Sequence, residues 1–142
     1  MNALEATKTV VGDSANGTAG TATLTIDTLG WGYASIDVIV AKSSTAGHTA
    51  ASVLNTLTLL QGDTTAATSA VYTVSAPAAS VAVTSQASVV RFDVDLNGTK
   101  RYLKVDASAV GTLATNIVAR LGQGEISPDT ASEAGLLAKY AG

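Results

Sequence analysis

The fold is decided by residues 89–106, VVRFDVDLNGTKRYLKVD. Apolar and charged side chains alternate along the first limb, which is the period of a strand with one buried face. The apolar face carries Val90, Phe92, Val94 and Leu96, and the opposite face carries Arg91, Asp93 and Asp95. Asn97 and Gly98 follow, and this dipeptide is the strongest two-residue turn signal because both positions of such a turn need a positive φ. The stretch therefore predicts a β-hairpin.

The second limb of this hairpin, residues 99–106, also alternates. One side carries Arg101, Leu103 and Val105, and the other carries Lys100, Tyr102 and Lys104. In a hairpin, Asp93 and Asp95 of the first limb would lie across from the lysines of the second. We therefore expect cross-strand charge pairs between the two limbs, each worth roughly 0.2–1 kcal/mol.

Alternation of the same kind recurs along the chain, whereas helical periodicity is nearly absent before the tail. The further predicted strands are residues 21–26, 33–40, 54–60, 71–74, 81–83 and 115–121, with 4–11 as a candidate edge strand. The side chains expected to point inward in three of them are Ala22, Leu24, Ile26, Ile36, Val38, Val40, Ile117, Ala119 and Leu121. About eight short strands separated by Gly/Ser/Thr/Ala-rich loops predict an all-β fold, an antiparallel sandwich or jelly roll.

The chain of 142 residues has the usual size of one domain, so we expect a single β-sandwich domain, 1–142, with a C-terminal arm at about 127–142. Ser127 followed by Pro128 is typical of a helix start. Gly135, however, weakens a helix over residues 130–140 by about 1 kcal/mol. The tail is therefore expected to be either a short helix or an extended arm that orders against a neighbouring molecule.

The composition favours a contact role over a charged cleft. Only 13% of the residues are charged, against about 25% in an average domain, so Thr, Ser, Asn and small apolar side chains must cover most of the surface. The net charge of −3 argues against nucleic-acid binding, which needs a basic face. There is no polybasic membrane patch and no apolar run of membrane-spanning length. Residues 1–8 lack the features of a signal peptide, so we expect cytoplasmic synthesis.

Each candidate for catalysis or metal binding lacks a required residue. Gly12-Asp13-Ser14 resembles a hydrolase nucleophile block, but the only histidine is His48, in a Gly/Thr/Ala-rich stretch. Residues 93–98 (DVDLNG) open like a calcium loop, yet Lys104 stands where the bidentate glutamate belongs. The chain has no cysteine, which excludes disulfides and thiolate metal sites. We predict no metal, no cofactor and no enzymatic activity.

Trp31, the only tryptophan, lies in a Gly-Trp-Gly turn and admits two interpretations. It is a binding platform for a sugar or a protein partner, or it caps the open end of a sandwich core. The cap is the favoured interpretation. The glycines around Trp31 and around Gln123 lack the third glycine and the following helix of a dinucleotide-binding loop.

Four blocks of the chain resemble the small phage capsid decoration, or cement, proteins. They are residues 27–40 (DTLGWGYASIDVIV), 57–63 (LTLLQGD), 92–105 (FDVDLNGTKRYLKV) and 117–132 (IVARLGQGEISPDTAS). They occur in the order of that family and span roughly residues 20–135. The resemblance implies a jelly-roll-like domain on the outer surface of an HK97-type shell, bridging major capsid proteins as a dimer or trimer. The long loops at 42–52 and 66–80 depart from the family's compact pattern.

On this interpretation the protein is a virion component made in the host cytoplasm. The expected capsid or subunit contacts are Trp31, Tyr33, Lys100, Arg101, Lys104, Leu136, Leu137 and Tyr140. The three cations would serve as anchors to an acidic shell surface. The alternatives are another virion β domain of the tail tube, a head fibre or the baseplate, and a carbohydrate-binding module that uses Trp31 and Tyr33. An enzyme is the least favoured class.

Overall fold

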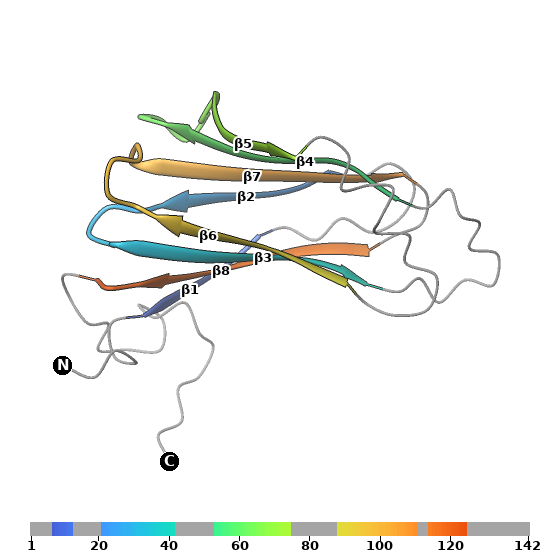
Figure 1. Ribbon diagram of the computed structural model, residues 1–142, viewed down its shortest axis with the longest axis horizontal. Helices are drawn as coiled ribbons and strands as arrows, with labels where there is room; N and C mark the ends of the chain where they lie inside the picture. The colour runs from blue at the N-terminus through green and yellow to red at the C-terminus, as the bar shows by residue number, and fades with distance from the viewer. Residues whose placement is uncertain (1–6, 13–20, 42–52, 75–87, 111–113, 125–142) are drawn as a thin grey trace, which may run out of the picture.

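A computed structural model describes residues 7–12, 21–41, 53–74, 88–110 and 114–124, and these parts are built from β-strands (Figure 1). The strands are β1 (Lys8–Val11), β2 (Thr21–Asp27), β3 (Tyr33–Ala41), β4 (Val53–Gly62), β5 (Ser69–Val74), β6 (Ser88–Asp95), β7 (Tyr102–Val110) and β8 (Ala114–Gly122). The predicted all-β class is confirmed. No helix in these parts is long and apolar enough to cross a membrane.

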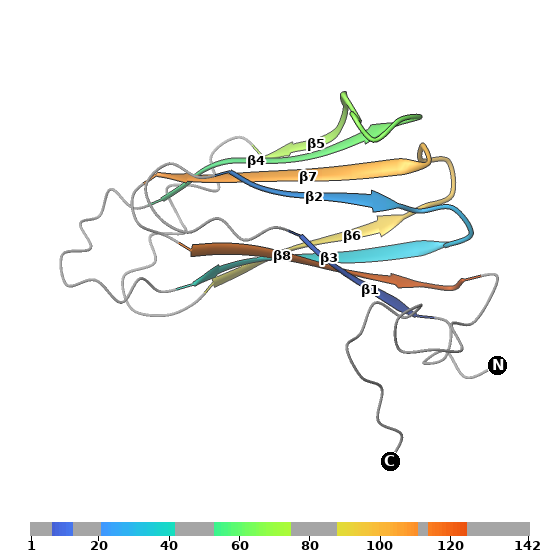
Figure 2. The same ribbon diagram turned by 180° about the vertical axis from the view of Figure 1, so that it is seen from behind.

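The strands form two four-stranded antiparallel sheets that lie face to face, as both views of the ribbon show (Figures 1 and 2). Sheet A has the order β1-β8-β3-β6, and sheet B has the order β2-β7-β4-β5. The first strand therefore pairs with the last, the second with the seventh, the third with the sixth, and the fourth with the fifth. This is the order of one long hairpin, with β4 and β5 at its tip, wound into two sheets, which is a jelly roll.

The core lies between the sheets and follows the alternation of the sequence. Along β2 every second residue is buried, and β3 and β8 show the same period. The core consists of Ala22, Leu24, Ile26, Ala34, Ile36, Val38, Val40, Leu57, Leu59, Phe92, Leu96, Leu103, Val105, Ala107, Ile117, Ala119 and Leu121. Every side chain predicted to point inward in residues 21–26, 33–40 and 115–121 belongs to it. Burial of these aliphatic side chains, at about 25 cal/mol per Å² of apolar surface, stabilises the sandwich.

The predicted hairpin over residues 89–106 is wrong. β6 pairs with β3 in sheet A, whereas β7 pairs with β2 and β4 in sheet B. Residues 96–101 therefore cross from one sheet to the other, over a spacing of about 10 Å between stacked sheets. Asn97 keeps a negative φ and Gly98 alone is positive (88°), so the two-residue hairpin turn does not form. The apolar faces of the two limbs face each other across the core, an arrangement with the same alternation as a hairpin.

The expected charge pairs between the limbs are absent for the same reason. Asp93 accepts hydrogen bonds from the side chains of Tyr33 and Ser35, its neighbours on sheet A. Lys100 instead pairs with Asp63 at 2.7 Å, and Lys104 pairs with an aspartate two residues along its own strand. The separation of β6 and β7 into different sheets decides both outcomes.

The bounds of two predicted strands differ from those in the structure. Of the candidate edge strand at 4–11, residues Lys8–Val11 form β1, at the edge of sheet A of this chain; its addition to the sheet of a neighbouring molecule stays a prediction. β7 begins at Tyr102 rather than at residue 99, because residues 99–101 belong to the crossing. The predicted strand at 81–83 and the C-terminal helix or arm at 127–142 lie outside the described residues.

Candidate functional site

Four connections meet at one end of the sandwich, and we call this surface the turn end. It consists of residues 28–32 between β2 and β3, 63–68 between β4 and β5, 96–101 between β6 and β7, and 123–124 after β8 (Figure 1). Two of the connections, 28–32 and 96–101, run from one sheet to the other.

The two crossings start with the same local structure. After β2, Asp27 Oδ1 accepts the Leu29 N–H (3.2 Å), and the Trp31 N–H donates to the Thr28 carbonyl (3.0 Å), with Gly30 at φ 81°. This is an aspartate-capped turn with the positive φ at its third position, the position that glycine prefers in a type II turn.

The crossing after β6 repeats this arrangement. Asp95 Oδ1 accepts the Asn97 N–H (2.9 Å), and the Thr99 N–H donates to the Leu96 carbonyl (3.1 Å), with Gly98 at φ 88°. The aspartate and the glycine are three residues apart in each turn. In residues 93–98, which open like a calcium loop in sequence, Asp95, Asn97 and Gly98 therefore form the turn of the crossing.

The two crossings are bonded to each other. The carbonyl of Arg101 accepts the backbone N–H of Thr28 (2.9 Å) and its hydroxyl (2.6 Å). The Leu96 N–H donates to the Gly32 carbonyl (3.0 Å). The Arg101 guanidinium adds two bonds to Asp27, from Nε to Oδ1 (3.0 Å) and from Nη2 to Oδ2 (2.8 Å). These bonds hold the crossings as one unit, so the turn end presents a preformed surface.

Trp31 closes this end of the core. Its half-buried ring packs against the buried cluster, and a Cβ added to Gly124 would come within 2.6 Å of the ring. A shallow hollow of about 190 Å³ adjoins the ring and is lined by Gly30, Trp31, Gly32, Asn97 and Gln123. A ring packed in this way agrees with the interpretation of Trp31 as a cap.

The structure gathers some of the expected contact residues and separates others. Trp31, Lys100 and Arg101 lie at the turn end. Tyr33 begins β3 and projects from the outer face of sheet A, because the next residue of the strand, Ala34, points into the core. Lys104 lies on the outer face of sheet B, 3.0 Å from Asp106. Leu136, Leu137 and Tyr140 lie outside the described residues.

The expected cationic anchors are paired within the chain. Lys100 Nζ lies 2.7 Å from Asp63, and Arg101 forms the two bonds to Asp27. The hydrogen bonds from Arg101 lower the pKa of the Asp27 carboxyl, and the same contact raises the pKa of Arg101. The turn end therefore carries salt bridges in place of free positive charge at Lys100 and Arg101.

The acid–base groups of the described chain can be compared with the expected absence of a metal site. Within those ranges, no three His, Cys, Asp or Glu side chains gather as metal ligands. The hydrogen bond to Asp93 raises the pKa of Tyr33 and lowers that of the aspartate, so at neutral pH the phenol keeps its proton and the carboxylate stays charged. His48 lies outside the described residues.

Sequence reasoning missed two features of this surface. Leu29 is 68% exposed at the tip of the first crossing, an apolar side chain open to a partner. The repeated Asp-x-x-Gly pattern of residues 27–30 and 95–98 marks both crossings and was readable in the sequence. Asp63 as the partner of Lys100 had no such signal, because 37 residues separate the two.

Comparison of the chain with protein-family models, with curated proteins and with solved structures finds no match.

Proposed function

We propose that this protein is a virion structural protein that decorates the outer surface of a phage capsid and bridges the major capsid proteins of an HK97-type shell. One observation carries the proposal: the blocks that resemble decoration proteins contain three of the four connections of the turn end and lead into the fourth. Residues 27–40 and 92–105 contain the two crossings, 57–63 leads into the β4–β5 loop, and 117–124 ends beside Trp31. Segments that are distant in sequence thus build one surface.

The chemistry of the turn end suits a stabilising contact. It offers one exposed apolar residue, Leu29, together with the polar side chains of Asn97 and Gln123 and the internally paired Lys100 and Arg101. Such a surface gives a modest affinity per contact. A bridging protein bound at many positions of a lattice gains its stabilisation from the number of linked contacts, so modest contacts suffice. In this proposal it binds as a dimer or trimer.

The deciding experiment is cryo-EM of the particle that carries this protein. We expect density of the size of this domain on the outer face of the head, with its turn end toward the shell. Density at the tail tube, at a head fibre or at the baseplate would replace this proposal with the corresponding alternative.

A binding assay tests the expected anchors. In Lys100→Glu/Arg101→Glu/Lys104→Glu, we expect the loss of binding to capsids stripped of the protein, measured by co-sedimentation. Arg120→Gln is the control, because it removes a cation that is 65% exposed on the outer face of sheet A and places no new carboxylate beside Asp37. Undiminished binding of the triple variant would remove these cations from the contact. Leu29→Asp tests the apolar part of the same surface.

A further inference from the structure

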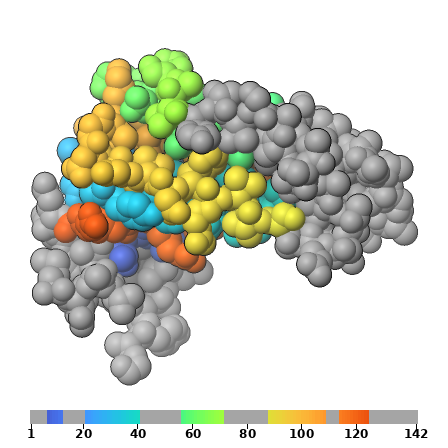
Figure 3. Space-filling view, in the orientation of Figure 1, coloured from blue at the N-terminus to red at the C-terminus, as the bar shows by residue number. Residues whose placement is uncertain are grey.

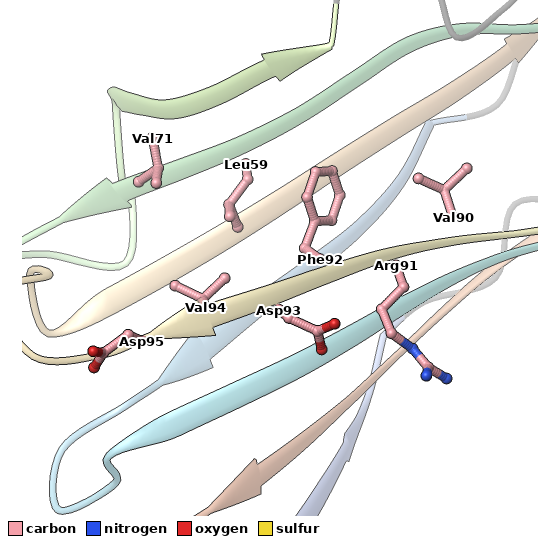
Figure 4. A pocket seen from close by; sticks show the side chains of 8 residues that line it. All are labelled: Leu59, Val71, Val90, Arg91, Phe92, Asp93, Val94 and Asp95. Atoms are coloured by element: carbon pink, nitrogen blue, oxygen red, sulfur yellow. The ribbon is translucent and has the colours of Figure 1, made fainter.

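A groove runs along the open side of the sandwich, where β6 of sheet A faces β4 and β5 of sheet B. Its volume is about 430 Å³, within the range of roughly 300–1,000 Å³ typical of ligand clefts. Figure 4 shows Val90, Phe92 and Val94 directed from β6 toward Leu59 and Val71. The three valines are only partly buried, so apolar surface of the core remains open here.

Among the described strands, β6 is the last of sheet A, so within that part of the chain the backbone of β6 has an open edge beside this groove. Figure 3 shows β6, in yellow, at the surface of the molecule. In an antiparallel pair, residues that exchange hydrogen bonds with the partner strand alternate with residues that do not. The Leu96 N–H donates to the Gly32 carbonyl at the end of the β3–β6 register. The even-numbered residues of β6 therefore bond to β3, and the N–H and C=O groups of Arg91, Asp93 and Asp95 point toward the open edge.

The charge along this edge is negative, because Arg91, the one cation among the described residues that line the groove, is paired with Asp37. Across the described ranges, four of the six aspartates form an ion pair with a lysine or arginine of the chain; the two without such a pair are Asp93 and Asp95. Both line the groove. Their present partners are neutral donors: Tyr33 and Ser35 for the first, and Asn97 for the second. The carboxylates of Asp93 and Asp95 are thus held in place by hydrogen bonds and are available to pair with a cation at this edge.

We propose that β6 accepts an extended segment of a partner protein in which apolar residues alternate with lysine or arginine. The segment adds to sheet A as a fifth strand, bonded to the backbone of Arg91, Asp93 and Asp95. Because successive side chains of a strand point to opposite faces, its apolar residues enter the groove and its basic residues lie beside Asp93 and Asp95. If the protein decorates a capsid, as proposed above, the segment belongs to the shell protein. Only this identity of the partner rests on the proposed function.

The test uses two synthetic peptides of about eight residues, the length of an ordinary strand. One alternates valine with lysine and the other valine with glutamate. We expect the Val/Lys peptide to bind roughly tenfold or more tightly by calorimetry, since each charge pair across a sheet contributes up to about 1 kcal/mol. Amide exchange followed by NMR should slow at Arg91, Asp93 and Asp95 when this peptide is bound.

Two controls separate strand addition from simple charge attraction. A Val/Lys peptide methylated on those backbone nitrogens that face β6 keeps its charge and should bind about tenfold or more weakly. Asp93→Asn/Asp95→Asn, which keeps an acceptor oxygen for the Asn97 turn, should lose the preference for the Val/Lys peptide. Asp63→Asn removes an exposed carboxylate that does not line the groove, so this variant should still prefer the Val/Lys peptide.

The proposal is overturned if neither peptide binds, if both bind equally, or if methylation leaves the affinity unchanged. The location of the protein on the particle does not enter these measurements. A tail location with selective peptide binding would therefore remove the capsid proposal alone, and a head location without peptide binding would remove this one alone.

Discussion

Asp37 lies on the outer face of sheet A, yet it is only 9% exposed because Arg91 covers it. Arg91 Nε donates to Oδ1 at 2.6 Å and Nη2 donates to Oδ2 at 3.1 Å. Arg120 approaches Oδ2 from the other side, at 4.0 Å. One carboxylate on β3 thus connects β6 and β8, the two strands that flank it.

Removal of this charge should weaken sheet A. In Asp37→Asn we expect the free energy of unfolding to fall by about 1 kcal/mol, measured by urea denaturation. The fall in the free energy of unfolding stays small because the side chain of Arg91 is half exposed and solvent screens the ion pair. Asp63→Asn is the matched control: its pair with Lys100 is exposed on both sides, so no measurable change is expected. Equal effects of the two substitutions would contradict the role of Asp37.

The free energy of unfolding should depend on pH through the carboxylates of Asp37 and Asp27. Hydrogen bonds from arginine lower the pKa of Asp37, and those from Arg101 lower the pKa of Asp27. The unfolded chain, with ordinary aspartate pKa values of about 3.9, then takes up protons before the folded one. This contribution to stability is complete above about pH 5 and is lost as the pH falls through the folded-state values. Urea midpoints between pH 7 and pH 2 should show the loss, and Asp37→Asn should make it smaller.

Thr115 has a fully buried side chain whose Oγ1 has no hydrogen-bond partner within the described chain. A buried hydroxyl without a partner costs about 1–3 kcal/mol. Thr115→Val keeps the shape and removes the hydroxyl, so we expect the unfolding free energy to rise by about 1 kcal/mol. Thr28→Val is the opposite case, because the Thr28 hydroxyl donates to the Arg101 carbonyl at 2.6 Å, and it should destabilise. Thermal unfolding of the two variants tests the difference in sign.

Trp31 should respond to its neighbour Gly124. Gly124→Ala places a methyl group within 2.6 Å of the ring, so the ring must move and become more exposed. We expect a red shift of the tryptophan emission, which reports on Trp31 alone because the chain has no other tryptophan. Gly122→Ala is the control, since its added Cβ meets nothing within 4 Å. An unchanged spectrum in Gly124→Ala would show that the ring does not depend on this packing.

Much of the candidate surface could be read from the sequence, though not its arrangement. Trp31 as a cap and the turn-forming glycines followed from local patterns. The burial of Asp37 did not, because a strand pattern places it outward and says nothing of an arginine 54 residues away. The same holds for Lys100 and Arg101, whose aspartate partners come from other strands or loops.

The alternation of the sequence determined which residues form strands and which faces are buried, because side-chain direction in a strand is a local property with a period of two. The tertiary structure alone decided that β6 and β7, joined through Asn97 and Gly98, belong to different sheets. A hairpin and a crossing bury the same side chains of the two limbs, so local alternation cannot separate them. Competition among all the strands for partners separates them. It also sets which charges meet and leaves Asp93 and Asp95 on the edge of sheet A as the described strands form it.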